Sequence, residues 1–196
     1  MRAASAAEGR VPRLPVDQSL AAGDQVGVPA LMAELSIFRV LLHHPPVAKA
    51  VFNLLSTLLF NSKLDRRLRE LVIMRIGWVT GSVYEWTQHW RVAKTLGVDE
   101  GDLLAVREWR SADRFGDPER AVLAATDETM ATGTISAETW AACVAHVGAR
   151  ENLLELVAAI GTWRMISSLL RSLEVPLEEG VEPWPPDGRD PARERA

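Results

Sequence analysis

Three side chains near the middle of the sequence have types and spacing suited to proton transfer. Glu85 and His89 are four residues apart, so on a helix they project from one face. Glu70 precedes them in a segment that also has helical periodicity. Imidazole titrates near neutral pH, and an apolar environment raises the pKa of a carboxylate toward neutrality. Brought together, the three side chains are suited to general acid–base catalysis.

Two expected helices joined by a tight turn position these residues. Residues 64–79 carry an apolar stripe, Thr80 and Gly81 form the turn, and a second helix follows as far as Leu96. Ser82 is the expected N-cap of the second helix, with Glu85 completing a capping box.

Helices joined in this way pack antiparallel, which places Glu70 opposite the middle of the second helix. We therefore expect both carboxylates and the imidazole to meet in a pocket walled by Trp86 and Trp90.

Spacing leaves a plainer interpretation open. Arg66 and Glu70 are also four residues apart, and this pair and the Glu85–His89 pair both match exposed ion pairs on helix surfaces. A metal site is not expected, because helical di-iron sites pair Glu and His at a spacing of three and no HExxH motif occurs. His43 and His44 are assigned to a helix end.

The remainder of the chain predicts an all-α domain. Residues 1–28 mix Ala, Gly, Pro and charge and are expected to form a flexible arm, and residues 182–196 a disordered Pro-rich tail. The folded domain is then 29–181, a bundle of about seven or eight helices without strands. Beyond the two helices above, the expected helices are 30–42, 47–60, 99–107, 118–131, 136–146 and 150–173. Several are apolar on more than one face, 47–60 on nearly all sides, which favours burial against copies of the chain.

Composition argues against a nucleic-acid-binding, membrane-spanning or secreted protein. The net charge of −4 offers no basic surface for nucleic acid. Apolar stretches such as 50–60 are short and interrupted, so no membrane span is expected, and the N-terminus lacks the apolar core of a secretory signal. Cys143 is the sole cysteine, which excludes an internal disulfide. We predict a cytoplasmic protein.

The segment from Leu64 to Val98 resembles the carboxymuconolactone decarboxylase / AhpD-like family. The matching features are the run RELVI, a short turn, the run YEWTQH, and Gly-Val before an acidic short helix. The peroxidase branch of that family has a Glu, a Cys-x-x-Cys pair and a His at fixed intervals. In this sequence the Glu falls on Glu70, the first Cys on Ser82, the second on Glu85 and the His on His89. The intervals are kept, but both sulfurs are absent.

The resemblance to the decarboxylase branch implies a cofactor-free lyase that acts on a small cyclic or unsaturated carboxylic acid. In that chemistry loss of CO2 leaves an enolate-like intermediate, which needs an acid and an oxyanion donor. His89 is the expected acid, with Glu85 or Glu70 as its partner, and Tyr84 or Arg75 is a candidate donor. Trp86 and Ser82 are expected to contact the small-molecule substrate.

Two other functions remain open. An AhpD-like peroxidase of the peroxiredoxin type is disfavoured, because Ser82 and Glu85 cannot replace its thiols and Cys143 is expected to be a small buried hydrophobe. The second alternative is a non-catalytic oligomeric binding protein. In that case Glu70, Glu85 and His89 are expected to face solvent. In each case we expect a homo-oligomer, with a trimer or a hexamer as the candidate assemblies.

Overall fold

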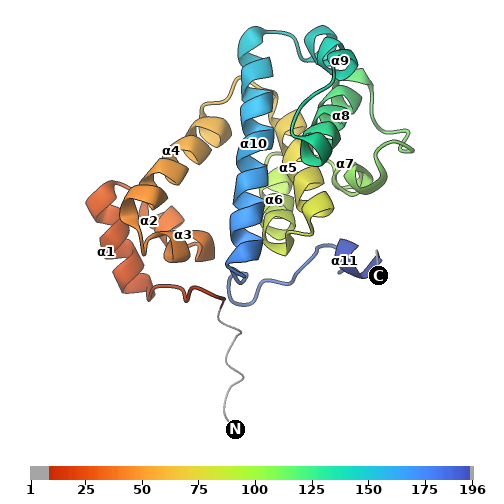
Figure 1. Ribbon diagram of the computed structural model, residues 1–196. Coiled ribbons are helices and arrows are strands. Elements are labelled where there is room, and N and C mark those ends of the chain that lie inside the picture. Colours follow the sequence, from red (N-terminus) through yellow and green to blue (C-terminus); the bar gives the residue numbers. More distant parts are fainter. Residues whose placement is uncertain (1–8, 195–196) are drawn as a thin grey trace. The chain divides into compact units, whose positions relative to one another are not determined.

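The computed structural model describes residues 9–194, and within them every regular element is helical. This confirms the predicted all-α class (Figure 1). The helices are α1 (Val16–Val26), α2 (Ala30–Ala33), α3 (Ser36–Leu41), α4 (Pro45–Phe60), α5 (Arg66–Thr80), α6 (Val83–Thr95), α7 (Glu100–Ala105), a 3-10 helix η1 (Val106–Glu108), α8 (Asp117–Thr132), α9 (Ala137–Val147), α10 (Arg150–Ser172) and α11 (Pro191–Glu194).

The described chain divides into two compact units by the contacts within it. The first contains α1 to α4 and residues 169–181, and the second contains residues 61–168 and 182–194. Helix α10 contributes its residues up to Ser168 to the second unit and those from Leu169 onward to the first. The candidate reactive residues belong to the second unit.

In the first unit, part of the expected N-terminal arm forms helix α1. Its buried positions are the small residues Ser19 and Gly23, which share one face of the helix. The Ser19 hydroxyl donates to the carbonyl of Ala33 at 2.6 Å, and a Cβ on Gly23 would lie 3.1 Å from that of Ala33. Close packing through small side chains leaves no apolar stripe in the sequence, so periodicity did not indicate this helix. Residues 1–8 of the expected arm lie outside the described residues.

The expected helices 30–42 and 47–60 also differ in detail. Leu35 adopts an extended conformation and splits the former into α2 and α3. The second begins at Pro45, whose fixed φ and missing N–H suit the first turn. Within the single chain it is not buried on all sides, because Phe60 is 70% exposed and Leu54 41%.

In the second unit, α5 and α6 form the predicted antiparallel hairpin (Figure 1). Asp65 caps α5 by accepting from the N–H of Leu68 at 3.0 Å, and Gly81 ends the helix with φ of 68°. The two helices approach closely at Gly77, where a Cβ would lie 3.0 Å from the backbone nitrogen of Trp86. The predicted capping box is absent, because the Ser82 side chain makes no capping hydrogen bond.

The expected disordered tail is packed against the second unit over residues 184–187. Trp184 is only 6% exposed, and its backbone N–H donates to the Thr87 hydroxyl at 3.2 Å. The Trp86 indole donates to the carbonyl of Pro185 at 2.7 Å. Burial of the Trp184 ring offsets the cost of ordering a charged, Pro-rich segment. The last two residues of the predicted tail, 195 and 196, lie outside the described part of the chain.

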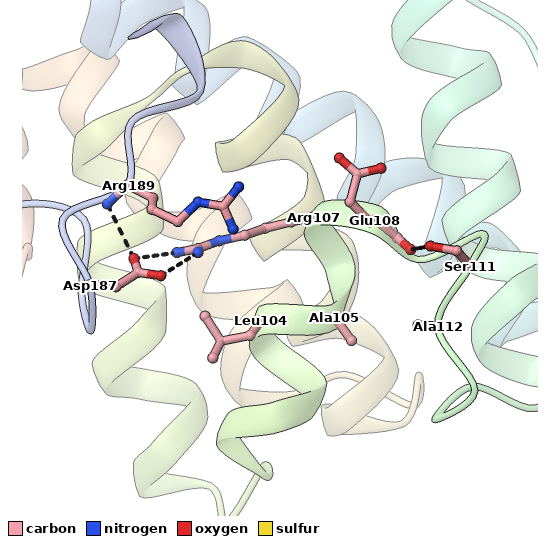
Figure 2. Close-up of a pocket in the computed structure, with 8 residues that line it drawn as sticks. All are labelled: Leu104, Ala105, Arg107, Glu108, Ser111, Ala112, Asp187 and Arg189. Carbon is pink, nitrogen blue, oxygen red and sulfur yellow. Dashed lines mark hydrogen bonds and ion pairs between the residues drawn. The ribbon is translucent and has the colours of Figure 1, made fainter. Parts of the chain in front are cut away.

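An ion pair also fixes this segment, as Figure 2 shows. The Arg107 guanidinium donates to both carboxylate oxygens of Asp187, at 2.7 and 3.0 Å. The same guanidinium lies 4.6 Å from the ring centroid of Trp78 and 4.7 Å from that of Trp86. Contact with two indole rings and a bidentate carboxylate offsets the cost of burying this charge.

We expect Asp187→Asn to loosen the tail and to lower the free energy of unfolding by about 1–2 kcal/mol. The amide leaves the buried Arg107 charge without its carboxylate, and the loss is moderated because Asp187 is partly exposed. Urea unfolding and the rate of tryptic cleavage at Arg189 measure the two effects. Asp190→Asn is the matched control, expected to stay within about 0.5 kcal/mol of the parent protein. Equal cleavage rates in Asp187→Asn and the parent would contradict this role.

Helix α10 is long and apolar enough, by length and composition, to cross a membrane. The sequence analysis expected no membrane-spanning helix, because it considered only uninterrupted apolar stretches and did not identify this helix. Half of its most apolar window is buried inside the protein, and buried core helices of soluble proteins meet the same criterion.

Candidate active site

Glu70 and His89 meet in the interior of the second unit. His89 Nδ1 lies 2.8 Å from a carboxylate oxygen of Glu70, and both side chains are buried. Glu70 comes from the middle of α5 and His89 from α6, so the antiparallel hairpin brings them together as the sequence predicted. With the proton on Nδ1, this contact is a hydrogen bond from the imidazole to the carboxylate.

The other oxygen of Glu70 accepts hydrogen bonds from Arg69. The guanidinium donates from Nε at 3.1 Å and from Nη2 at 3.0 Å, and the Arg69 side chain is buried like that of Glu70. Glu70 therefore pairs with Arg69 and His89 in the interior, which overturns the alternative of a surface pair with Arg66. Sequence spacing did not indicate Arg69, because adjacent residues on a helix do not ordinarily face each other.

Glu85 approaches the opposite side of the imidazole. A carboxylate oxygen lies 3.6 Å from His89 Nε2, and Glu85 is 4% exposed. Burial raises the pKa of Glu85 to about 7, with a further contribution from the charge of Glu70 and an opposing one from His89. Near neutral pH this carboxyl group is therefore present in both protonated and ionised forms.

Trp163 of α10 completes the array, and sequence analysis did not single it out. Its indole N–H donates to His89 Nε2 at 3.1 Å, and its ring meets the imidazole edge-on at 5.6 Å between centroids. A donor at Nε2 holds that nitrogen as an acceptor and so places the His89 proton on Nδ1, toward Glu70. No local spacing could have shown this contact, because the two residues lie 74 positions apart.

Charge interactions oppose burial in setting the pKa values of Glu70 and His89. Burial acts to raise the pKa of Glu70, but His89 and Arg69 outweigh it and the pKa of this carboxyl is lowered. Burial acts to lower the pKa of His89, but the charge and hydrogen bond of Glu70, together with the charge of Glu85, raise it above its ordinary value. Glu70 is thus held as the anion.

The tryptophans expected to wall the site form a separate aromatic cluster. Trp86 is fully buried, with its ring centroid 5.3 Å from that of Trp78 and 6.1 Å from those of Trp90 and Trp184. Its indole N–H is already bonded to the tail. These contacts favour a packing role for Trp86. Tyr84 is also buried.

The structure does not bring Arg75 to the cluster around His89. Its guanidinium makes a bidentate ion pair with Asp127, at 2.7 and 3.0 Å, and donates to the carbonyls of Val106 and Arg107. The same carboxylate accepts from the indole of Trp109. Arg75 thus ties α5 to α8 and η1.

The hydroxyl of Ser82 is buried and makes no hydrogen bond with another described residue. It lies three residues before Glu85, at the start of α6.

Cys143 is buried in α9, and its Sγ lies 3.6 Å from the carbonyl of Ala121. Burial, with the charge of Glu128, raises the pKa of this thiol to about 11. A thiol with so high a pKa carries little thiolate at neutral pH, which matches the expected buried hydrophobe. In the described residues no group of three or more His, Cys, Asp or Glu side chains is arranged to hold a metal ion.

Two surface hollows lie away from this array. One of about 330 Å³ is bordered by α7, η1 and the tail, with Arg107, Ser111 and Arg189 in its lining (Figure 2). The other, of about 550 Å³, lies between α1 and α2 in the first unit. Neither lining includes Glu70, Glu85 or His89.

Part of the chain is similar in sequence to a known family. Residues 45–128 match the model of the carboxymuconolactone decarboxylase family, a span that includes Glu70, Glu85 and His89. Among curated proteins, none matches the chain in sequence.

Solved structures share the fold at low sequence identity. The AhpD core structure of an uncharacterized peroxidase-related protein from Ralstonia eutropha JMP134 has a TM-score of 0.70 at 17% identity, covering 89% of this chain and 95% of that one. A peroxidase-related protein from Silicibacter sp. TM1040 has a TM-score of 0.70 at 13% identity, with coverage of 91% and 96%. The apo form of the debrominase Bmp8 has a TM-score of 0.68 at 17% identity, with coverage of 86% and 92%. Residues 45–128 thus match the model of the carboxymuconolactone decarboxylase family, and the chain shares the all-helical fold of these AhpD-like structures.

Proposed function

We propose that this protein is a cofactor-free enzyme that uses acid–base catalysis on a small cyclic or unsaturated carboxylic acid, by decarboxylation or a related proton transfer. The observation that carries the proposal is the buried array in which His89 lies between Glu70 and Glu85. Glu70 and Trp163 fix the ring through its two nitrogens. Such a constrained imidazole beside a second carboxyl group suits proton delivery more than it suits stability alone.

The proposed reaction needs one proton donor and no electron transfer. The bond between the carboxylate carbon and its neighbour breaks, CO2 leaves, and the electron pair is delocalised as an enolate. Glu85 in its acid form delivers a proton to carbon, or His89 does so as the imidazolium once its Nε2 is released from the Trp163 indole. Water then restores the proton to the pair. A donor with a pKa near 7 is suited to both steps, because it is available as acid and as base at neutral pH.

A thiol-dependent peroxidase is the weaker alternative. Its chemistry needs a thiolate to attack the peroxide and a second thiol to resolve the product. Ser82 and Glu85 occupy the positions that the two cysteines take in the peroxidase branch. Cys143, on α9, has a raised thiol pKa.

A non-catalytic binding protein is also less well supported. That function predicts solvent-facing acids and imidazole with ordinary pKa values. The three side chains are instead buried, and burial of charged groups without a function generally costs stability.

Turnover by a His89→Gln variant tests the proposal. The purified protein is incubated with carboxymuconolactone and with unsaturated lactone acids, and CO2 release and deuterium uptake at carbon are followed by NMR. We expect turnover by the parent protein and a loss of about 10²–10⁴-fold in kcat for His89→Gln, the usual contribution of a positioned acid or base. His146→Gln, which changes an exposed histidine, is the control and should retain full activity. Equal turnover by His89→Gln and the parent, or no turnover of any of these substrates, would reject the proposal.

A further inference from the structure

Two buried hydroxyl groups of the second unit, and one carboxyl group of the array, have no close polar partner of the usual kind. The hydroxyls of Ser82 and Ser167 make no hydrogen bond with any other described residue, and both residues are almost completely buried. The contact between the Glu85 carboxylate and His89 Nε2, at 3.6 Å, is longer than a hydrogen bond. Buried polar groups in native proteins are nearly always bonded, so the two unbonded hydroxyls call for an explanation.

Two contacts at different positions along α10 show in which direction this helix runs relative to α5 and α6. Near the start of α5, the Glu155 carboxylate accepts from the N–H groups of Lys63 and Leu64 at 2.6 and 2.8 Å. Two turns further along α10, Trp163 contacts His89, which is itself bonded to Glu70 in the middle of α5. Helix α10 therefore runs in the same direction as α5 and opposite to α6.

This direction puts Ser167 at about the same level of the bundle as Glu85. Ser167 is four residues after Trp163, so it shares the buried face of that residue and lies about 6 Å further along the axis. That step leads toward the turn at Gly81. On α6 the step from His89 to Glu85 and Ser82 leads to the same turn, where a Cβ on Gly77 of α5 would lie 3.5 Å from that of Glu85. The two hydroxyls and the carboxyl group thus occupy one end of the array.

We propose that Ser82 and Ser167 donate hydrogen bonds to a carbonyl oxygen of the substrate, next to the carbon that Glu85 protonates. This inference rests on the proposed acid–base function and names its substrate class, compounds whose reacting carbon adjoins a carbonyl group, such as lactones and cyclic ketones. When CO2 or a proton leaves that carbon, the electron pair moves onto the carbonyl oxygen. Two hydroxyl donors stabilise the resulting oxyanion. Glu85 then protonates the carbon, the carbonyl double bond reforms, and the hydroxyls return to a neutral acceptor.

The residue types fit this role. A serine hydroxyl rotates freely and both donates and accepts, so it follows the change from carbonyl to oxyanion. Donors without an intramolecular partner are available to the substrate, and the stability lost in the free protein is recovered when the oxygen binds. Glu70 and Arg69 are unsuited, because each already bonds a charged partner.

Binding of an unreactive lactone tests the pair without any need for turnover. The probe is γ-butyrolactone labelled with ¹³C at its carbonyl, and the measurements are its Kd and the carbonyl stretching frequency of the bound form. We expect saturable binding to the parent protein with a lowered carbonyl frequency. Ser167→Ala and Ser82→Ala should each weaken binding by roughly 5–10-fold, the net value of one hydrogen bond. The double variant should show no frequency shift.

Ser168→Ala is the matched control, because this neighbouring hydroxyl is exposed and bonded to the carbonyl of Arg164. It should bind the probe like the parent protein. A second readout is stability, since removal of an unbonded buried hydroxyl should raise the Tm of Ser167→Ala by roughly 2–6 °C. A lower Tm would assign Ser167 to a structural hydrogen bond and overturn the proposal.

The remaining outcomes separate this proposal from the function on which it rests. No binding of the probe to the parent protein, or an equal carbonyl frequency in parent and double variant, overturns the hydroxyl pair. A lowered carbonyl frequency that depends on both serines, without decarboxylation or deuterium uptake, would support the role of the two hydroxyls. It would reject the proposed reaction.

Discussion

Glu70→Gln is expected to lower the free energy of unfolding by about 3–5 kcal/mol at pH 7, a large share of the stability of a protein of this size. The amide keeps the shape of the side chain but removes the charge that offsets Arg69 and His89 in the interior. Breaking a buried pair on one side costs this much because the opposite charge stays buried. Urea unfolding followed by circular dichroism measures the loss.

The same variant should show a characteristic pH dependence. The pKa of Glu70 is lowered in the folded protein, so its stabilising contribution is present above the ordinary value of 4.5 and is lost as the pH falls. The difference between parent and Glu70→Gln should therefore shrink on acidification. Glu100→Gln is the matched control, since it removes a carboxylate from an exposed pair with Lys94 and should cost less than about 1 kcal/mol. Equal effects of the two substitutions would contradict the buried charge network.

Glu85→Gln should affect turnover and stability in opposite directions. Because Glu85 is the proposed proton donor, its replacement should lower kcat by about 10²–10⁴-fold. The pKa of Glu85 is raised to about 7, so the folded protein holds a proton between pH 4.5 and 7 that the unfolded chain has released. The corresponding stability is fully present below pH 4.5 and is lost as the pH rises through 7.

The amide cannot ionise, so Glu85→Gln should be more stable than the parent by up to about 3 kcal/mol at pH 8 and nearly equal to it at pH 4.5. Unfolding curves at the two pH values measure this difference. Glu100→Gln again serves as control and should leave both turnover and the pH profile unchanged. A variant that loses both activity and stability at pH 8 would indicate that Glu85 has a structural role.

Local geometry allowed the sequence to indicate the centre of the site. Glu85 and His89 share a face because a spacing of four residues is close to one helical turn, and Gly81 permits the left-handed turn that reverses the chain. Those two facts predicted that Glu70 and His89 would meet. The all-α class followed from helical periodicity along most of the chain. The sequence did not predict helix α1, because its buried residues Ser19 and Gly23 are small and do not form an apolar stripe.

Contacts between distant segments were decided only by the tertiary structure. Trp163 bonds His89, Glu155 fixes the direction of α10, and Trp184 folds the tail back onto the second unit, each across more than 70 positions of sequence. Burial likewise distinguished the Glu70 array from a surface ion pair, and it raised the pKa of Glu85. Helical spacing determines which side chains share a face, but the neighbours that cover that face come from the packing of the whole unit. The side chains around an ionisable group, and hence its proton affinity, are therefore a property of the tertiary structure.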